Sequence, residues 1–328
     1  MSEEIKNEET TTNTTEAGVS TVKDYILYPR QYESYRWFRP IVTALLAAVF
    51  FIVISNVMTL ITSMIVPGGR EAYEQLKTGY DGFDAYSLAG AIMSLGSIAC
   101  MLLALFLATL VLRDRPLSSY SSARGGWRFS VFFKCFAICL VVSALPVAII
   151  TIIGAGDKTP TKFTILGFIL CTILGPLQCI AEEYIFRGLL FQAVGSWTKN
   201  VVIAIIISMV LFMSQHPYNI YGVLEVGAMG ALMCIAVVIT KGLEASSAIH
   251  ITNNMTLFYL TGFGISKIQK NAELESLIES TIIYLVYVII LYVISKKYGW
   301  FEPVKKDDVT PYNAKYLAKK EVKRMNNV

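Results

Sequence analysis

The stretch Cys179-Ile-Ala-Glu-Glu-Tyr-Ile-Phe-Arg-Gly188 places three charged side chains in an otherwise apolar run. Ionisable groups at membrane depth are costly and are functional candidates by default. If the stretch is helical, Glu183 and Arg187 lie at i and i+4, in the order that favours an ion pair, whereas Glu182 points about 100° away from them. We therefore expect one neutralised carboxylate and one carboxylate, that of Glu182, without a local partner. This makes Glu182 the first candidate for chemistry.

The composition predicts a polytopic membrane protein. Of 328 residues, 55% are hydrophobic and only 16% are charged, whereas soluble domains are on average about a quarter charged. All six cysteines fall inside apolar runs without CxxC spacing, so we expect small buried residues rather than disulfides or zinc ligands. The predicted surroundings are the lipid bilayer, and no nucleic-acid partner is expected.

Apolar segments long enough to cross a bilayer core of about 30 Å predict an all-α bundle of about eight transmembrane helices. They lie at residues 41–66, 87–112, 131–154, 163–193, 200–216, 221–240, 245–262 and 277–295. This predicts a membrane core at 41–295 with a motif region at 163–262. Around the core we expect a disordered cytoplasmic tail at 1–22, an interfacial segment rich in aromatic and basic residues at 23–40, and a basic cytoplasmic tail at 296–328.

The distribution of Lys and Arg predicts the orientation. Basic residues are concentrated before the first helix, between the second and third, and after the last, whereas the loop after the first helix carries four acidic residues, Glu71, Glu74, Asp81 and Asp84. The positive-inside rule then places both termini in the cytoplasm. We expect a multi-pass protein of the cell membrane.

The chain has two histidines, and both lie in or at the end of predicted helices. His216 precedes Pro217, which puts it at or near the last helical position, and His250 shares a helix face with Asn254 at i and i+4. At about 1.5 Å per residue, Glu182 and His216 both lie roughly 20 to 30 Å from the turn between their helices, so they can meet. His250 lies only a few residues past its own turn. It reaches the same depth only if the turns are staggered or the helices are tilted.

Each of these polar groups also has a structural interpretation. Glu183 and Arg187 can form a purely structural ion pair, Asn254 can hydrogen-bond between helices, and a single membrane histidine is often structural. Four such groups on three helices are harder to explain in this way. Together they favour a site formed by Glu182, His216, His250 and Asn254.

The segments Glu182-Glu183-x-x-x-Arg187, Phe212-x-x-x-His216 and His250-x-x-x-Asn254 resemble, in order and spacing, the three motifs of the CPBP family. This family, also called ABI, contains CAAX-type proteases and bacteriocin-processing enzymes. The resemblance implies an intramembrane endopeptidase that cleaves a membrane-associated peptide or protein. It also implies that Glu182 and His216 activate a water, that His250 and Asn254 stabilise the oxyanion, and that Glu183, Arg187 and Phe212 support the site.

Three alternatives remain open on the sequence. A zinc ion held by Glu182, His216 and His250 would suit a hydrolase, although the lack of HExxH in a histidine-poor chain favours a reaction without a cofactor. A non-catalytic membrane scaffold or bacteriocin-immunity protein would keep the same cavity for binding. A transporter with Glu182 as proton carrier is disfavoured because the chain shows no repeated halves.

Overall fold

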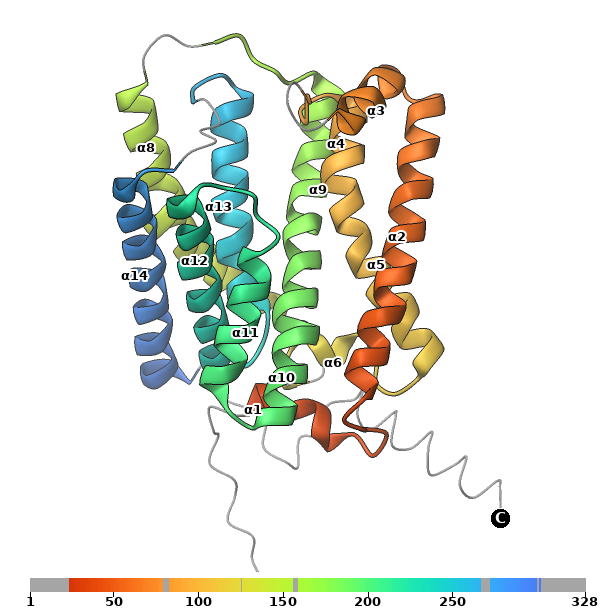
Figure 1. The fold of residues 1–328 in the computed structure, drawn as a ribbon. Coiled ribbons are helices and arrows are strands. Elements are labelled where there is room, and N and C mark those ends of the chain that lie inside the picture. Colours follow the sequence, from red (N-terminus) through yellow and green to blue (C-terminus); the bar gives the residue numbers. More distant parts are fainter. Residues whose placement is uncertain are drawn as a thin grey trace, which may run out of the picture.

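The computed structural model describes residues 24–78, 83–124, 126–155, 159–266, 272–299 and 301. Within these ranges every regular element is helical, and the only β-type contact is an isolated bridge between Ser122 and Gly242. The predicted all-α class is confirmed (Figure 1). The predicted tail at 1–22 and residues 302–328 of the basic tail lie outside the described residues.

Six helices in the described part of the chain are long and apolar enough to cross a membrane, so the chain is a multi-pass membrane protein. Three are single helices: α2 (Arg39–Ile65), α12 (Ile220–Thr240) and α14 (Leu274–Tyr298). The other three each continue through a π-helical segment: α4 (Leu88–Ala91), η2 (Ile92–Gly96) and α5 (Ser97–Leu112); α7 (Phe129–Cys139), η3 (Leu140–Ala144) and α8 (Leu145–Gly154); and α9 (Ile165–Glu183), η4 (Tyr184–Leu190) and α10 (Phe191–Thr198).

The other two predicted spans are helices of a different kind. α11 (Val201–Met213) has 13 residues, which is about 20 Å and less than a bilayer core of about 30 Å. α13 (Glu244–Gly262) has 19 residues but is polar, and nearly all of its first half is buried because α7, α9 and α12 pack around it. All eight predicted segments are therefore helical, but only six satisfy the length and composition of a membrane span.

The helices form one connected bundle. α2 packs on α5, α5 on α9, α9 on α13, and α13 on α7 and α12, while α12 also contacts α11 and α14. Figure 1 shows α3 (Gly69–Lys77) at one end of the bundle, and α1 (Asp24–Leu27), α6 (Ser118–Ser121) and the last turn of α14 at the other. The connection between α11 and α12 lies well below the upper ends of α2, α9 and α13, within the height of the bundle.

The predicted interfacial segment packs against the end of the bundle. α1 and the 3₁₀ turn η1 (Tyr28–Gln31) contact α10. Tyr25 is fully buried and its hydroxyl donates to the carbonyl of Tyr120 at 2.6 Å, and the Trp197 indole donates to the carbonyl of Trp37 at 2.7 Å. The Trp37 ring itself remains exposed. The segment thus combines buried anchors with an exposed aromatic of the kind found at headgroup depth.

The turn between α12 and α13 is held inside the protein by the segment that follows α6. The Arg128 guanidinium donates to both carboxylate oxygens of Glu244, at 2.9 and 2.6 Å, and also to the carbonyl of Thr240 at 2.7 Å. The backbone N–H of Leu243 donates to the carbonyl of Ser121 at 2.7 Å. Because this turn is covered, the first residues of α13 start deep in the bundle rather than at its surface.

Candidate active site

The two glutamates lie in the middle of the longest apolar helix. Glu182 comes 17 residues after Ile165 and 16 before Thr198, which is about 25 Å from either end at 1.5 Å per residue. Glu182 and Glu183 are the last residues of α9, and η4 begins at Tyr184. π-Helical turns inside α-helices occur frequently at functional sites because the extra residue redirects the side chains that follow. Pro176 lies inside α9 without ending it.

Glu183 and Arg187 form the ion pair that their spacing predicts. Arg187 Nη1 lies 3.0 Å from Glu183 Oε1, and both side chains are fully buried. The Arg187 guanidinium also lies over the ring of Phe212, 4.2 Å from its centroid, and its Nη2 donates to the carbonyl of Gly230 at 3.4 Å. A Cβ at Gly230 would lie 3.2 Å from the Phe212 ring and 3.3 Å from Arg187 Nη2, so the glycine lets α12 approach the ion pair.

Glu182 is not as isolated as the sequence suggested. The Gln178 side-chain amide, one turn earlier on α9, donates to Glu182 Oε1 at 2.7 Å, and His250 Nε2 lies 3.5 Å from Glu182 Oε2. The expectation of a carboxylate without a local partner is therefore wrong. Among the described residues Glu182 still has no ion pair with Lys or Arg, so its partners are one neutral amide and one histidine.

His250 joins the two carboxylates. It is 2% exposed, its Nδ1 lies 2.9 Å from Glu183 Oε1, and its Nε2 faces Glu182. The mismatch in depth expected from the sequence is thus resolved: the α12–α13 turn is set into the bundle, which brings His250 level with the end of α9. A carboxylate oxygen thus lies near each ring nitrogen, and the nitrogen that carries the proton can donate.

His216 approaches the site through Phe212. α11 ends at Met213, so His216 lies three residues beyond the helix in a turn rather than at its last position, in keeping with the proline that follows. His216 Nδ1 lies 2.9 Å from the carbonyl of Phe212. The Phe212 ring contacts the rings of His216 and His250, at 4.8 and 6.1 Å between centroids. Among the described residues no hydrogen bond joins His216 to Glu182.

Asn254 lies one turn after His250 on α13. Its side-chain oxygen accepts from the amide of Asn253 at 3.1 Å, and its amide lies within interaction range of the Cys179 thiol on α9. Since Cys179 precedes Glu182 by three residues on the same helix, Asn254 faces the helix that carries the glutamates. The structure thus gathers Glu182, Glu183, Arg187, Phe212, His250 and Asn254 into one region, with His216 beside Phe212.

Two neighbours of this site are not among the residues predicted from the sequence. One is Gln178. The other is Tyr218, in the α11–α12 connection, whose ring lies 5.7 Å from that of His216. The pKa of Tyr218 is raised above its usual value by partial burial, and further by the negative charges of Glu182 and Glu225. The only sequence signals were an amide one turn before Glu182 and an aromatic residue two positions after His216.

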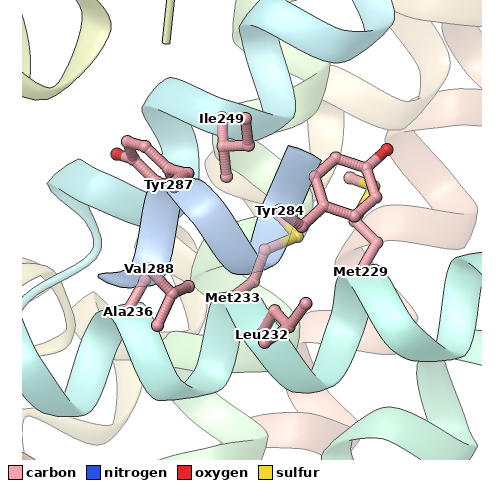
Figure 2. A pocket seen from close by; sticks show the side chains of 8 residues that line it. All are labelled: Met229, Leu232, Met233, Ala236, Ile249, Tyr284, Tyr287 and Val288. Carbon is pink, nitrogen blue, oxygen red and sulfur yellow. The ribbon is translucent and has the colours of Figure 1, made fainter. Parts of the chain in front are cut away.

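The residues suggested as zinc ligands are not assembled into a coordination shell. Within the described residues no group of three or more His, Cys, Asp and Glu side chains is arranged to hold a metal ion. Figure 2 shows a narrow pocket between α12, α13 and α14, lined by apolar side chains and by Tyr284 and Tyr287. None of the predicted catalytic residues lines it, so this pocket is not the site.

The comparison with protein families gives a match over the region that contains this geometry. Residues 161–256 match the family described as type II CAAX prenyl endopeptidase Rce1-like. Over this region the chain is similar to the Rce1-like CAAX protease family. The resemblance drawn from the three motifs is confirmed, and the family is one of membrane proteases. A comparison with curated proteins and another with solved structures found no match for the chain.

Proposed function

We propose that this protein is an intramembrane endopeptidase that hydrolyses a peptide bond of a membrane-associated peptide or protein. The observation that carries the proposal is the environment of Glu182: a carboxylate halfway along a membrane helix, hydrogen-bonded by Gln178, facing His250, and without a Lys or Arg partner in the described residues. A general base has to remain uncompensated by a fixed cation and within reach of a water. Glu183, one residue later, has its charge matched by Arg187 and serves the fold.

In the proposed reaction a water lies between Glu182 and His216. Glu182 takes a proton from the water as its oxygen attacks the substrate carbonyl carbon, and the carbonyl oxygen becomes an oxyanion. Donors from His250 and Asn254 stabilise that oxyanion, which is the usual way in which proteases lower this barrier. The C–N bond then breaks and the proton held by Glu182 moves to the leaving nitrogen, which restores the carboxylate. No cofactor takes part in these steps.

The same proposal assigns an orientation. Arg39 at the start of α2, Arg113 after α5 and Lys297 at the end of α14 belong to helix ends at one end of the bundle (Figure 1). Following the positive-inside rule, we place this end and both termini in the cytoplasm of a cell. Substrates would then be peptides or proteins of the cell membrane, with or without a prenyl group.

The test uses the protein in proteoliposomes with two quenched fluorogenic peptides that end in the same CAAX sequence, one farnesylated and one unmodified. We expect cleavage by the wild type and a loss of about 10²- to 10⁴-fold for Glu182→Gln, as is typical when a general base is removed. The matched control is Glu225→Gln, the same change at a half-buried carboxylate on α12, which should leave the rate unchanged.

A second readout does not depend on the choice of peptide. The new chain ends present in membranes of cells with the wild-type protein are compared with those of cells carrying Glu182→Gln. Cleavage predicts ends that disappear in the variant. If neither peptide is cleaved and the two sets of ends are identical, the protein is not a protease, and the scaffold or immunity alternative replaces it.

A further inference from the structure

A chain of three polar side chains runs from α14 to the predicted site. Tyr284 is 4% exposed, and its hydroxyl donates to Asn253 Oδ1 at 2.9 Å. The side-chain nitrogen of Asn253 in turn donates to Asn254 Oδ1 at 3.1 Å. Figure 2 shows that the Tyr284 ring lies along the apolar pocket while its hydroxyl points away from it. A residue on the last helix is thereby linked to Asn254 on α13.

These two hydrogen bonds fix which end of the Asn254 amide is available. A side-chain amide presents an acceptor oxygen at one end and two N–H donors at the other. In Asn254 the oxygen is occupied by Asn253, so the nitrogen end is the one turned elsewhere, and Asn254 lies within interaction range of Cys179, on the helix of Glu182. An oxyanion requires donors that are already aimed before the reaction, and an amide turned the other way would present an oxygen and repel it.

We propose that Tyr284 and Asn253 are positioning residues that hold the Asn254 side chain with its N–H group toward the oxyanion. The proposal rests on the role given to Asn254 in the proposed function. Tyr284 lies outside residues 161–256, the region matched to the family. The last helix therefore contributes to the reaction although it carries none of the three motifs.

A purely structural role is the alternative, because a buried tyrosine hydroxyl generally needs a hydrogen-bond partner. Helix α14 itself provides a matched control for this structural role. Tyr287, also on α14 and 1% exposed, donates to the carbonyl of Ala245 at 2.9 Å. Tyr287→Phe removes a buried hydroxyl and one hydrogen bond to α13, as Tyr284→Phe does, but leaves the Asn254 chain intact.

The kinetic test measures kcat and KM in proteoliposomes with whichever CAAX peptide the wild type cleaves. Asn254→Ala should lower kcat by about 10²- to 10³-fold, as expected for one oxyanion donor. Tyr284→Phe should lower kcat by about tenfold with KM unchanged, since it loosens that donor without removing it. Tyr287→Phe should leave kcat unchanged. In the Asn254→Ala background, Tyr284→Phe should have no further effect, because residues that act through one group are not additive.

Different failures of this test have different meanings. If Asn254→Ala keeps full kcat, the role of Asn254 in the proposed function is wrong, and the positioning role falls with it. If Asn254→Ala lowers kcat but Tyr284→Phe does not, or if the effect of Tyr284→Phe persists in the Asn254→Ala background, only the positioning role is overturned.

A stability measurement tests the hydrogen bond between Tyr284 and Asn253 directly, whether or not either peptide is cleaved. Thermal unfolding is recorded for Tyr284→Phe, Asn253→Ala and the double variant. If the two side chains bond to each other, the double variant should melt no lower than Asn253→Ala alone, because the tyrosine hydroxyl that it removes has already lost its partner. Additive shifts in Tm would overturn the proposal.

Discussion

Glu183→Gln should destabilise the protein far more than the same change at Glu182. In the folded protein Arg187 is fully buried, and Glu183 is its ion-pair partner at 3.0 Å. Its other contacts are with neutral groups: the carbonyl of Gly230 at 3.4 Å, the sulfur of Met233 at 3.6 Å, and the ring of Phe212, whose centroid is 4.2 Å away. The substitution leaves a buried cation with neutral acceptors, and the breaking of such a pair costs about 3 to 5 kcal/mol. The equilibrium constant for unfolding should therefore rise roughly a hundredfold to a few thousandfold.

Two variants serve as controls. Glu182→Gln weakens contacts with Gln178 and His250 but leaves no arginine unpaired, so it should cost only about 1 kcal/mol, the contribution of a typical hydrogen bond. Glu183→Gln combined with Arg187→Met removes both charges. It should recover much of the lost stability, because replacing a buried pair with apolar groups is often neutral.

The assay is reversible unfolding in mixed micelles with increasing SDS, followed by tryptophan fluorescence. The reasoning is refuted if Glu183→Gln costs no more than Glu182→Gln, or if the double variant is no more stable than Glu183→Gln alone. Either result would mean that water or lipid headgroups solvate Arg187 despite its burial.

Three further results are expected. A cysteine replacing Arg70, exposed on α3, should react with a membrane-impermeant maleimide on intact cells, and one replacing Arg113 only after permeabilisation; the reverse pattern would invert the topology. Peptide cleavage should survive 1,10-phenanthroline and the purified protein should hold no stoichiometric zinc, whereas an activity lost to the chelator and restored by zinc would establish a site of Glu182, His216 and His250. Gln178→Leu should lower kcat about tenfold, the equivalent of one hydrogen bond, and an unchanged kcat would show that Gln178 does not orient Glu182.

The positions of the helices could be predicted from the sequence because each depends on a local pattern, the run of apolar residues that is needed to cross a bilayer. The Glu183–Arg187 pair could be predicted for the same reason, since residues at i and i+4 on a helix are neighbours wherever the helix lies. The motifs also indicated a family, which the match over residues 161–256 confirms.

The contacts between helices could not be predicted in this way. The depth of His250 depends on a turn set into the bundle by Arg128 and Glu244, which are more than a hundred residues apart in sequence. The hydrogen bond from Gln178 to Glu182 depends on side-chain rotamers. The hydrogen bond from Tyr284 to Asn253 joins two helices, and no periodic pattern around either residue in the sequence predicts it.

The arrangement of charges explains how two adjacent glutamates can have different tasks in one apolar environment. Glu183 Oε1 holds Arg187 at 3.0 Å and His250 at 2.9 Å, so this carboxylate is engaged from two sides. His250 then reaches across to Glu182 at 3.5 Å. Arg187 matches the charge of Glu183, and breaking such a buried pair is costly. Glu183 thus holds the histidine that faces Glu182, whereas Glu182 itself accepts a hydrogen bond from the neutral amide of Gln178.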